Sequence, residues 1–321
     1  MIGLDAHPDS FTAAVLRGAT PAAAVTEKIF NQVPLAQLQR WAKKQTTPQD
    51  RFVLEASGNS FQIVRTLASI ERKALVLESG QMGKLKETHA NNDKISAVRI
   101  GKAYLAGTAK EVWVPDTRTQ ERRDCYHAHR KAVRRTTQLR NRLQSYLSDN
   151  GVRLKQGTRL TQMLQVSPLI QKARDWSPLQ WRVIEGILLE LDHAEKQRQH
   201  WRSLIAQEVL SDPTLLSIVR LCGVREMIAF ALGAFIGDIQ RFAEPKKLVK
   251  YIGLNPAFDH SGKGEWDGGI GGHGHKELRC LLIEGAHAIL RSSRRLWRHG
   301  ARNCWPAREK KTWWRQRWRK N

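Results

Sequence analysis

The sequence predicts an α/β domain over residues 1–116, a helical coiled-coil arm over 117–210 and a small, mostly helical domain over 211–292, followed by a basic tail over 293–321. Short apolar, β-prone runs alternate with helical spacing in the first segment. The second segment lacks strand signals, and glycines divide the third into short helices. The 321 residues suffice for two or three domains that each bury a core.

The N-terminal segment begins with two β-prone runs, Met1–Leu4 and Thr12–Leu16, which the polar turn between them predicts to be a hairpin. Helical spacing follows over Pro34–Lys44. Arg51–Leu54 is the next apolar run, and it ends at Glu55 and a turn-like sequence. The alternation of strand and helix signals therefore starts immediately after the hairpin.

The same alternation continues to residue 116. Apolar residues at 63, 67 and 70 predict a helix, and Ala74–Leu77 predicts a strand. Asp93–Leu105 has apolar residues spaced for one helix face, and Val112–Val114 ends the block. A hairpin followed by β-α-β-α units indicates a sheet with helices on its faces.

Two long helices are expected in the arm, over 117–149 and 178–210. Asn150–Gly151 marks a break, and Pro178 suits the first position of a helix. Because these helices are charged and only partly apolar, we expect a coiled-coil hairpin that dimerises, clamps nucleic acid, or does both.

The third segment contains three short helical patterns, Leu215–Leu221, Met227–Ile236 and Lys247–Ile252. Asn255–Gly264, which includes Ser261, is predicted to be a flexible loop, and a glycine-rich stretch runs from Ser261 to Gly274. An apolar helix is expected over Lys276–Leu290.

The net charge is +24, with a sequence pI near 10.4. Residues 117–142 carry nine Lys and Arg against two acids, and residues 291–321 carry twelve against one. Such concentrated charge favours a polyanionic partner, above all nucleic acid. A solvated helix face remains the alternative for 117–142. For the tail, Trp packing on the body and a sequence grown out of frame without a selected role remain alternatives. The residues predicted to contact nucleic acid are Arg122, Arg123, Arg130, Arg134, Arg135, Arg140, Asn141 and Arg142.

The N-terminus lacks the features of a signal peptide, and no apolar run is long enough for a membrane span. The four cysteines are scattered, which favours reduced thiols. We therefore expect a cytoplasmic protein without a membrane partner.

Asp5 and Glu55 each follow a predicted strand, and Asp93 opens a predicted helix. Because ligand sites gather at the carboxyl ends of strands in open α/β sheets, these carboxylates are candidate ligands for Mg²⁺ or Mn²⁺. The alternative is that Asp93 caps its helix and that Asp5 and Glu55 are ordinary surface carboxylates. Spacing alone favours this alternative.

Ser261 stands beside Asp259, His260 and Lys263. A serine hydroxyl becomes a nucleophile when a base or a metal accepts its proton, so Ser261 is a candidate for attack on a DNA phosphate. Most loop serines have no such role. Gly269, Gly271 and Gly274 match a dinucleotide-binding fingerprint only formally, because no clear strand precedes them.

Three motifs, Ile2–Asp5, Leu54–Gly58 and Asn92–Ala97, resemble the RuvC-like "DEDD" domain of bacterial insertion-sequence transposases. Relatives of this family include bridge-RNA-guided serine recombinases and piv-type invertases. Further motifs that resemble the family's C-terminal transposase domain are Phe235–Phe242, Tyr251–Pro256 and Ser261–Gly262.

The resemblance implies an RNase H/RuvC-like first domain in which Asp5, Glu55 and Asp93 bind Mg²⁺ or Mn²⁺. It implies that Ser261 attacks a DNA phosphate, in a composite site formed by domains of different subunits. It further implies donor and target DNA and a guide RNA as partners, a homo-oligomer (dimer or tetramer), and a bacterial, nucleoid-associated location.

The chain departs from the family pattern in three places. Ser96 stands where the family has its second helix carboxylate, and Asp9 is a possible substitute ligand. Arg225 replaces the second of two glycines, and the Trp/Arg tail replaces an aliphatic helix. Two alternative functions therefore stay open: a metal-dependent RuvC-like nuclease without a covalent intermediate, and a catalytically impaired nucleic-acid-binding remnant.

Overall fold

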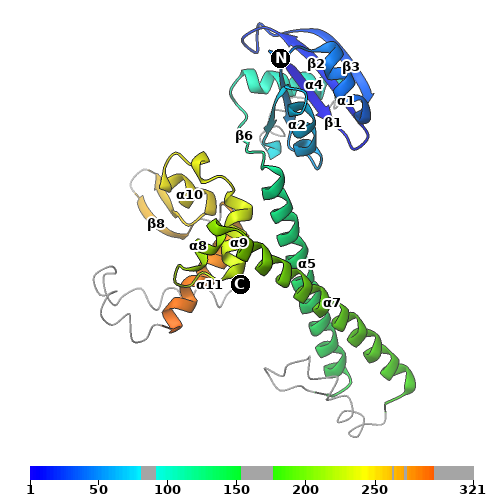
Figure 1. Ribbon diagram of the computed structural model, residues 1–321, viewed down its shortest axis with the longest axis vertical. Helices are drawn as coiled ribbons and strands as arrows, with labels where there is room; N and C mark the ends of the chain where they lie inside the picture. Colours follow the sequence, from blue (N-terminus) through cyan, green and yellow to red (C-terminus); the bar gives the residue numbers. More distant parts are fainter. Residues whose placement is uncertain (81–91, 153–175, 262–263, 271–272, 293–321) are drawn as a thin grey trace. The chain divides into compact units, whose positions relative to one another are not determined.

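The computed structural model describes residues 1–80, 92–152, 176–261, 264–270 and 273–292, with side chains for all of these except 257–268 and 290–292. The chain divides into two compact units, Met1–Asp116 and Thr117–Asn321 (Figure 1). Each unit has its own buried core.

A mixed six-stranded sheet forms the centre of the first unit, in the order β3-β2-β1-β4-β5-β6. Strands β1, β4 and β5 are parallel, whereas β2, β3 and β6 run antiparallel to their neighbours. This arrangement is consistent with an RNase H-like domain. The strands are β1 (Ile2–Ala6), β2 (Ser10–Arg17), β3 (Val25–Pro34), β4 (Arg51–Glu55), β5 (Lys73–Leu77) and β6 (Glu111–Val112).

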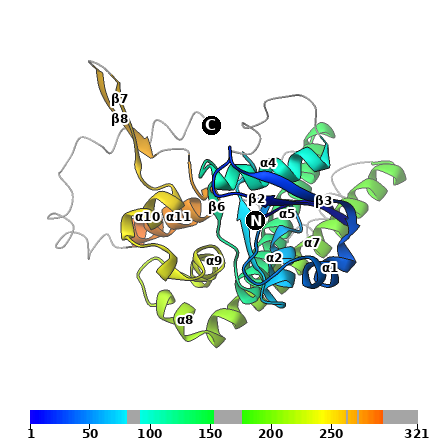
Figure 2. The same cartoon turned by 90° about the horizontal axis from the view of Figure 1, so that it is seen from above.

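Helices cover both faces of this sheet (Figure 2). On one face lie η1 (Leu35–Gln37), α1 (Leu38–Gln45) and α2 (Ser60–Ala68), and on the other lies α4 (Asp93–Leu105). The α1 face has an aromatic centre, because the Trp41 ring meets those of Phe11 and Phe52 edge-on, with centroids 5.1 and 6.2 Å away. Such edge-to-face pairs stabilise a core beyond the area they bury.

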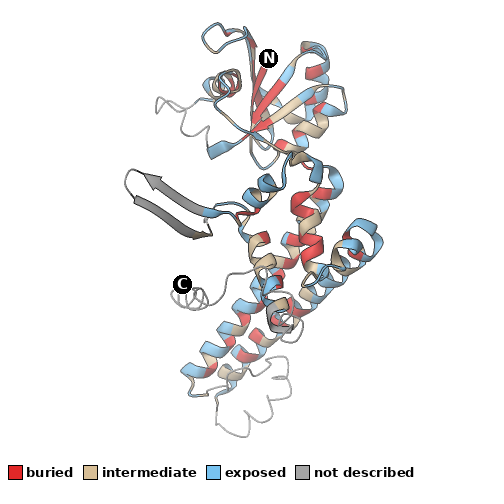
Figure 3. Ribbon diagram, turned by 90° about the vertical axis from the view of Figure 1, so that its left-hand side faces the viewer, coloured by how far each residue is buried: buried red, intermediate tan, exposed pale blue. Residues whose placement is uncertain are grey.

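Two long antiparallel helices, α5 (Thr117–Asp149) and α7 (Pro178–Ser211), dominate the second unit. Figure 3 shows buried residues on both helices. On α5 these include residues 132, 136, 139, 143 and 147, whose three- and four-residue spacing forms one helix face. The Ser177 side chain caps α7 in a capping box, with Pro178 in the first turn as expected.

Short helices pack around the base of this pair: α8 (Pro213–Val219), α9 (Glu226–Ile236), η3 (Ile239–Arg241), α10 (Pro245–Ile252) and α11 (Lys276–Ser292). Their core includes Tyr126 of α5, whose ring lies 5.0 Å from that of Phe235. The helical arm and the C-terminal helices therefore share one core.

Two features differ from the sequence-based expectations. Strand β3 was not expected, because it lies at the sheet edge and is largely exposed, so its sequence lacks a clear alternation. The expected flexible loop over Asn255–Gly264 is wrong, since β7 (Pro256–Ser261) and β8 (Gly264–Ile270) pair as an antiparallel hairpin. Three glycines within β8 obscured the β pattern.

None of the helices in the described ranges combines the length and the apolar character that crossing a membrane requires.

Candidate functional site

Close packing of α4 on β1 depends on small residues. A Cβ atom on Gly3 would lie only 2.0 Å from the carbonyl oxygen of Ala97, and one on Gly101 would lie 2.2 Å from Leu16 Cδ1. Neither distance is compatible with a real side chain. The glycine that precedes Leu4-Asp5 therefore allows the helix to lie directly over the strand.

Alternation along the strands decides which side chains face α4. Leu4 and Leu54 belong to the core on the α1 and α2 face, whereas Val53 packs with Ile100 of α4 on the other. Since successive side chains point to opposite faces, Asp5 and Glu55 lie on the α4 face. The parallel register pairs Leu4 with Leu54, so these carboxylates occupy adjacent positions at the carboxyl ends of neighbouring strands.

The first turn of α4 brings a third carboxylate to this edge. Asn92 caps the helix by accepting a hydrogen bond from the Lys94 backbone N–H at 2.7 Å, and Asp93 follows the cap. Asp5, His7 and Asp93 each offer a ligand atom within 4.8 Å of the others, and all three residues are half-buried. The structure thus brings together two of the three predicted carboxylates, and Glu55 ends the adjacent strand.

His7 is the member of this group that sequence reasoning missed. Its Nε2 atom lies 3.4 Å from Asp93 Oδ1 and 4.0 Å from Asp5 Oδ2. This nitrogen is buried and makes no hydrogen bond to any described residue. The sequence signal was available, since an Asp-x-His triplet directly follows a strand whose end was assigned to a ligand site.

The backbone around His7 is held in place on both sides. Its N–H donates to the Ser10 carbonyl at 2.8 Å, and the Asn59 side-chain amide donates to its carbonyl at 2.8 Å. These bonds fix the backbone of His7 without using its imidazole nitrogens.

The donor set fits a divalent metal ion. Carboxylate oxygens suit Mg²⁺ and Mn²⁺, and an imidazole nitrogen shifts the preference toward Mn²⁺ or another transition metal. Ser96 lies one turn beyond Asp93 on the same side of α4. Asp9, which was suggested as a substitute for the carboxylate missing at Ser96, is exposed on the turn after β1. A buried, unbonded nitrogen facing two carboxylates is the arrangement that a bound cation would complete.

Ser261 belongs to the second unit. It is the last residue of β7 and pairs with Gly264 of β8. Its side chain lies outside the described ones, so its role as a nucleophile stays a prediction.

The predicted nucleic-acid-binding arginines of α5 have partners within their own unit. Arg122, one-eighth exposed, donates to Glu208 at 2.8 Å and to Asp212. Burial favours the neutral form of Asp212, but hydrogen bonds from Arg122 and from the α8 backbone outweigh it and lower the pKa of this carboxyl. Arg122 therefore joins the ends of α5, α7 and α8.

The other arginines of this set also contact α7, α9 or α11, mostly through carboxylates. Arg123 donates to the Ala234 carbonyl at 2.8 Å, and Asn141 is exposed. The ion pairs are Arg130–Glu277, Arg134–Glu277, Arg135–Glu190, Arg140–Glu195 and Arg142–Glu190. Nucleic-acid binding by these residues stays a prediction, and it would require phosphates to compete with carboxylates.

Comparison with known proteins supports the resemblance seen in the motifs. Residues 217–300 match the family model described as "Transposase IS116/IS110/IS902 family". A "Putative transposase y4qE" of Sinorhizobium fredii is 24% identical over 236 residues, which cover 73% of this chain and 57% of the relative. The "Transposase for insertion sequence element IS1111A" of Coxiella burnetii is 25% identical over 241 residues, covering 74% and 65%.

A "Probable family 20 transposase" of Pseudomonas aeruginosa is 22% identical over 239 residues, covering 74% of this chain and 70% of the relative. The chain thus spans between about half and about two thirds of the length of the curated relatives it matches. These findings confirm the similarity to insertion-sequence transposases. The "DEDD" acidic signature, the serine chemistry and the RNA guide stay predictions.

Proposed function

We propose that the chain acts as an insertion-sequence transposase that cuts and rejoins DNA with a divalent metal ion. One observation carries this proposal. A chain whose residues 217–300 match a transposase family also has two carboxylates and an imidazole within 4.8 Å at the edge of an RNase H-like sheet.

In this proposal Asp5, Asp93 and the Nε2 atom of His7 hold Mg²⁺ or Mn²⁺, with Glu55 from the neighbouring strand as a further ligand. A bound divalent ion polarises a phosphodiester and stabilises the oxygen that leaves it. The packing of α4 on Gly3 fixes Asp93 opposite Asp5. Fixed ligands of this kind orient a phosphate before the reaction begins.

Ser261 is the proposed nucleophile. Its hydroxyl loses a proton and forms an O–P bond to the DNA phosphate, while the bond from phosphorus to the leaving sugar oxygen breaks and that oxygen takes up a proton. Attack by a second DNA hydroxyl then releases the serine. Each step exchanges one phosphodiester for another, so no external energy source is needed. Support comes from the motif at Ser261 and from the family match that covers it.

The partners are part of the same proposal. Donor and target DNA are the substrates, a guide RNA pairs with both, and a homo-oligomer, dimer or tetramer, supplies the two halves of a composite site. Support comes from the charge, because residues 117–321 carry about five sixths of the net +24. The proposed location is the bacterial cytoplasm, at the nucleoid.

A single assay tests this function. The protein is incubated with RNA transcribed from its own element, end-labelled DNA junctions and Mg²⁺ or Mn²⁺, and protein–DNA adducts are resolved on denaturing gels. We expect a covalent adduct that Ser261→Ala abolishes and Asp5→Asn prevents. Ser217→Ala, on the exposed surface of α8, is the matched control.

The other outcomes separate the alternatives. Cleavage without an adduct, unaffected by Ser261→Ala, would indicate a nuclease that uses metal-activated water. Binding without cleavage under both metals would indicate a nucleic-acid-binding remnant and would refute the proposed activity.

A further inference from the structure

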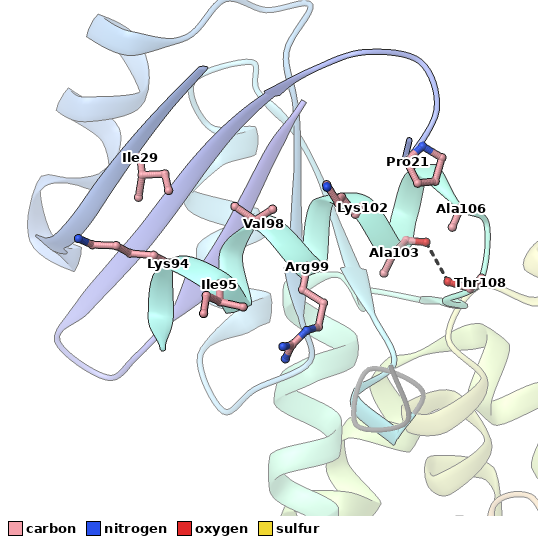
Figure 4. A pocket seen from close by; sticks show the side chains of 10 residues that line it. All are labelled: Pro21, Ile29, Lys94, Ile95, Val98, Arg99, Lys102, Ala103, Ala106 and Thr108. Atoms are coloured by element: carbon pink, nitrogen blue, oxygen red, sulfur yellow. Dashed lines mark hydrogen bonds between the residues drawn. The ribbon is translucent and has the colours of Figure 1, made fainter. Parts of the chain in front are cut away.

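An open groove of about 580 Å³ runs along the outer side of α4 in the first unit (Figure 4). Three cationic side chains of α4 line it, Lys94, Arg99 and Lys102. Apolar side chains lie between and opposite them, including Ile95 and Val98 of α4 and Ile29 of β3. Ile29 and Ile95 are 37% and 42% exposed, so the apolar lining is open to solvent.

No described carboxylate neutralises the cations of this groove. Within the part of the chain that the structure describes, none of Lys94, Arg99 and Lys102 forms an ion pair with a carboxylate. The arginines of α5 differ, because most of them contact Glu190, Glu195, Glu208 or Glu277. Free cations beside exposed apolar side chains suit a ligand with negative charges along an apolar frame, which describes a sugar–phosphate backbone.

The position of the groove relates it to the acidic group. Lys94 directly follows Asp93, whose carboxylate lies 3.4 Å from His7 Nε2. Lys94 and Lys102 are eight residues apart on one helix, which corresponds to about 12 Å along its axis. One DNA strand presents a phosphate every 3.4 Å of helix axis, so the groove matches a run of about four phosphates that begins beside the acidic group.

We propose that this groove binds the backbone of the DNA strand that is cut, and that it guides this strand to Asp5, His7 and Asp93. Lys94, Arg99 and Lys102 contact successive phosphates, and Ile95 and Val98 pack against the deoxyribose rings. Only the statement that the bound strand is the one that is cut rests on the proposed function, because binding itself needs neither metal nor cleavage.

The test compares two triple variants of the full chain that lose the same charge. K94Q/R99Q/K102Q removes the three positive charges that line the groove, whereas R40Q/K43Q/K44Q removes three exposed cations of α1 in the same unit. Binding to a 30-base-pair DNA is measured in EDTA over a range of salt concentrations. Each lost phosphate contact reduces the slope of log K against log salt by about 0.9, so we expect a reduction of about 2.7 for the groove variant and almost none for the control.

A second measurement locates the DNA. Ile95 is replaced by the photoreactive p-benzoylphenylalanine, with Lys43 as the control position, and the protein is irradiated with labelled DNA or an RNA duplex of equal length. We expect a DNA adduct at position 95 that exceeds the one at 43. Equal slope changes in the two triple variants, or an adduct at 95 with RNA alone, would overturn the proposal.

These measurements contain no divalent metal, so they remain informative if the enzyme does not cut. If the wild-type protein does not cut DNA in the adduct assay but both groove measurements succeed, the proposed function is refuted and the DNA-binding role of the groove still stands. If the wild-type protein cuts DNA but both groove measurements fail, the groove proposal is refuted and the proposed function still stands.

Discussion

Helices α4 and α5 both carry rows of cations, but the surroundings of these cations are opposite. Most arginines predicted from α5 to bind nucleic acid contact carboxylates of α7 or α11, whereas the three cations of the α4 groove have no such partner in the described residues. Residues 117–142 have the higher density of positive charge in the sequence. Charge density along a chain therefore does not identify the cations that are available to a ligand.

The difference comes from long-range pairing. The acids that contact the α5 arginines lie 48 to 147 residues further along the chain. No i,i+3 or i,i+4 pattern on α5 itself could indicate such partners. The following predictions test whether α5 is mainly structural and α4 mainly functional, and they are arranged from the largest expected effect to the smallest.

Asp5→Asn should have the largest effect, and it should act on catalysis alone. The amide keeps the size of the carboxylate but loses the charge that holds a divalent ion, and metal stabilisation of a reacting phosphate is worth several kcal/mol. We expect strand transfer to fall by at least about a thousandfold, which corresponds to about 4 kcal/mol, with RNA binding nearly unchanged.

The matched control is Asp9→Asn, an exposed carboxylate four residues away on the turn after β1. It should leave strand transfer within about twofold of wild type, because surface charges that touch no reacting group contribute little. A parallel loss of RNA affinity in Asp5→Asn would contradict the view that the acidic group acts in catalysis and that RNA binding lies elsewhere.

Arg122→Met should give the largest loss of stability. It removes the more buried of the two arginine partners of Asp212 at a half-buried junction of three helices, and breaking such a pair leaves a poorly compensated charge that costs about 3 kcal/mol. Urea unfolding followed by circular dichroism measures this change.

Arg118→Met is the control for this prediction. Arg118 contacts the same Glu208 and Asp212, but its side chain is 59% exposed. The expected loss is below about 1 kcal/mol. Equal losses in both variants would mean that burial does not set the strength of these pairs.

His7→Ala should weaken Mn²⁺ binding more than Mg²⁺ binding, because only the transition metal gains from an imidazole ligand. Perturbing the shell around a metal costs at least about tenfold in affinity, and we expect at least that loss for Mn²⁺ by calorimetry. Electron spin-echo spectroscopy of bound Mn²⁺ should show a nitrogen coupling in wild type that the variant lacks. Wild-type protein without this coupling would remove His7 from the ligand set.

His129 should make the folding stability of the second unit sensitive to pH. Burial, reinforced by Arg130, Arg198 and Arg202, lowers the pKa of His129 below 6.5. Below pH 6.5 the unfolded chain therefore binds more protons at this site than the folded chain, so folding stability should decrease as the pH falls. The comparison of wild type with His129→Gln between pH 8 and 5 by thermal unfolding should show a smaller decrease in the variant. An identical pH dependence would mean that other groups cause it.

The sequence predicted those parts of the molecule that local patterns encode. The bounds of α4 agree, because Asp93–Leu105 has both an Asn cap and a periodic apolar face. Strand β3 was missed because its few apolar residues lie at an exposed edge, and the β7–β8 hairpin was missed because of its glycines. These strands form because they pair with a neighbouring strand, and such pairing cannot be predicted from a short stretch of sequence.

The same distinction applies to the site. Asp5, Glu55 and Asp93 were predicted from their positions at strand and helix ends, and the structure brings Asp5 and Asp93 together. His7 was missed although it stands two residues after Asp5, a position that could have indicated a ligand. Its contact with Asp93, 86 residues away, depends on Gly3 allowing α4 to approach β1.

The smallest effect is expected at Arg134, and it decides how complete the contrast between the two helices is. Arg134 donates to Glu277 at 3.1 Å, but its side chain is 67% exposed, so Arg134→Gln should cost less than about 1 kcal/mol of stability. A pair that weak can exchange its carboxylate for a phosphate. We therefore expect the slope of log K against log salt for duplex RNA to fall by about 0.9 in Arg134→Gln, and to stay unchanged in Arg122→Met, because the Arg122 charge is buried against Asp212. An unchanged slope in Arg134→Gln would make α5 structural along its length and would leave the RNA to the other basic surfaces. The expected fall would instead show that α5 binds nucleic acid through its exposed pairs and holds the fold together through its buried ones.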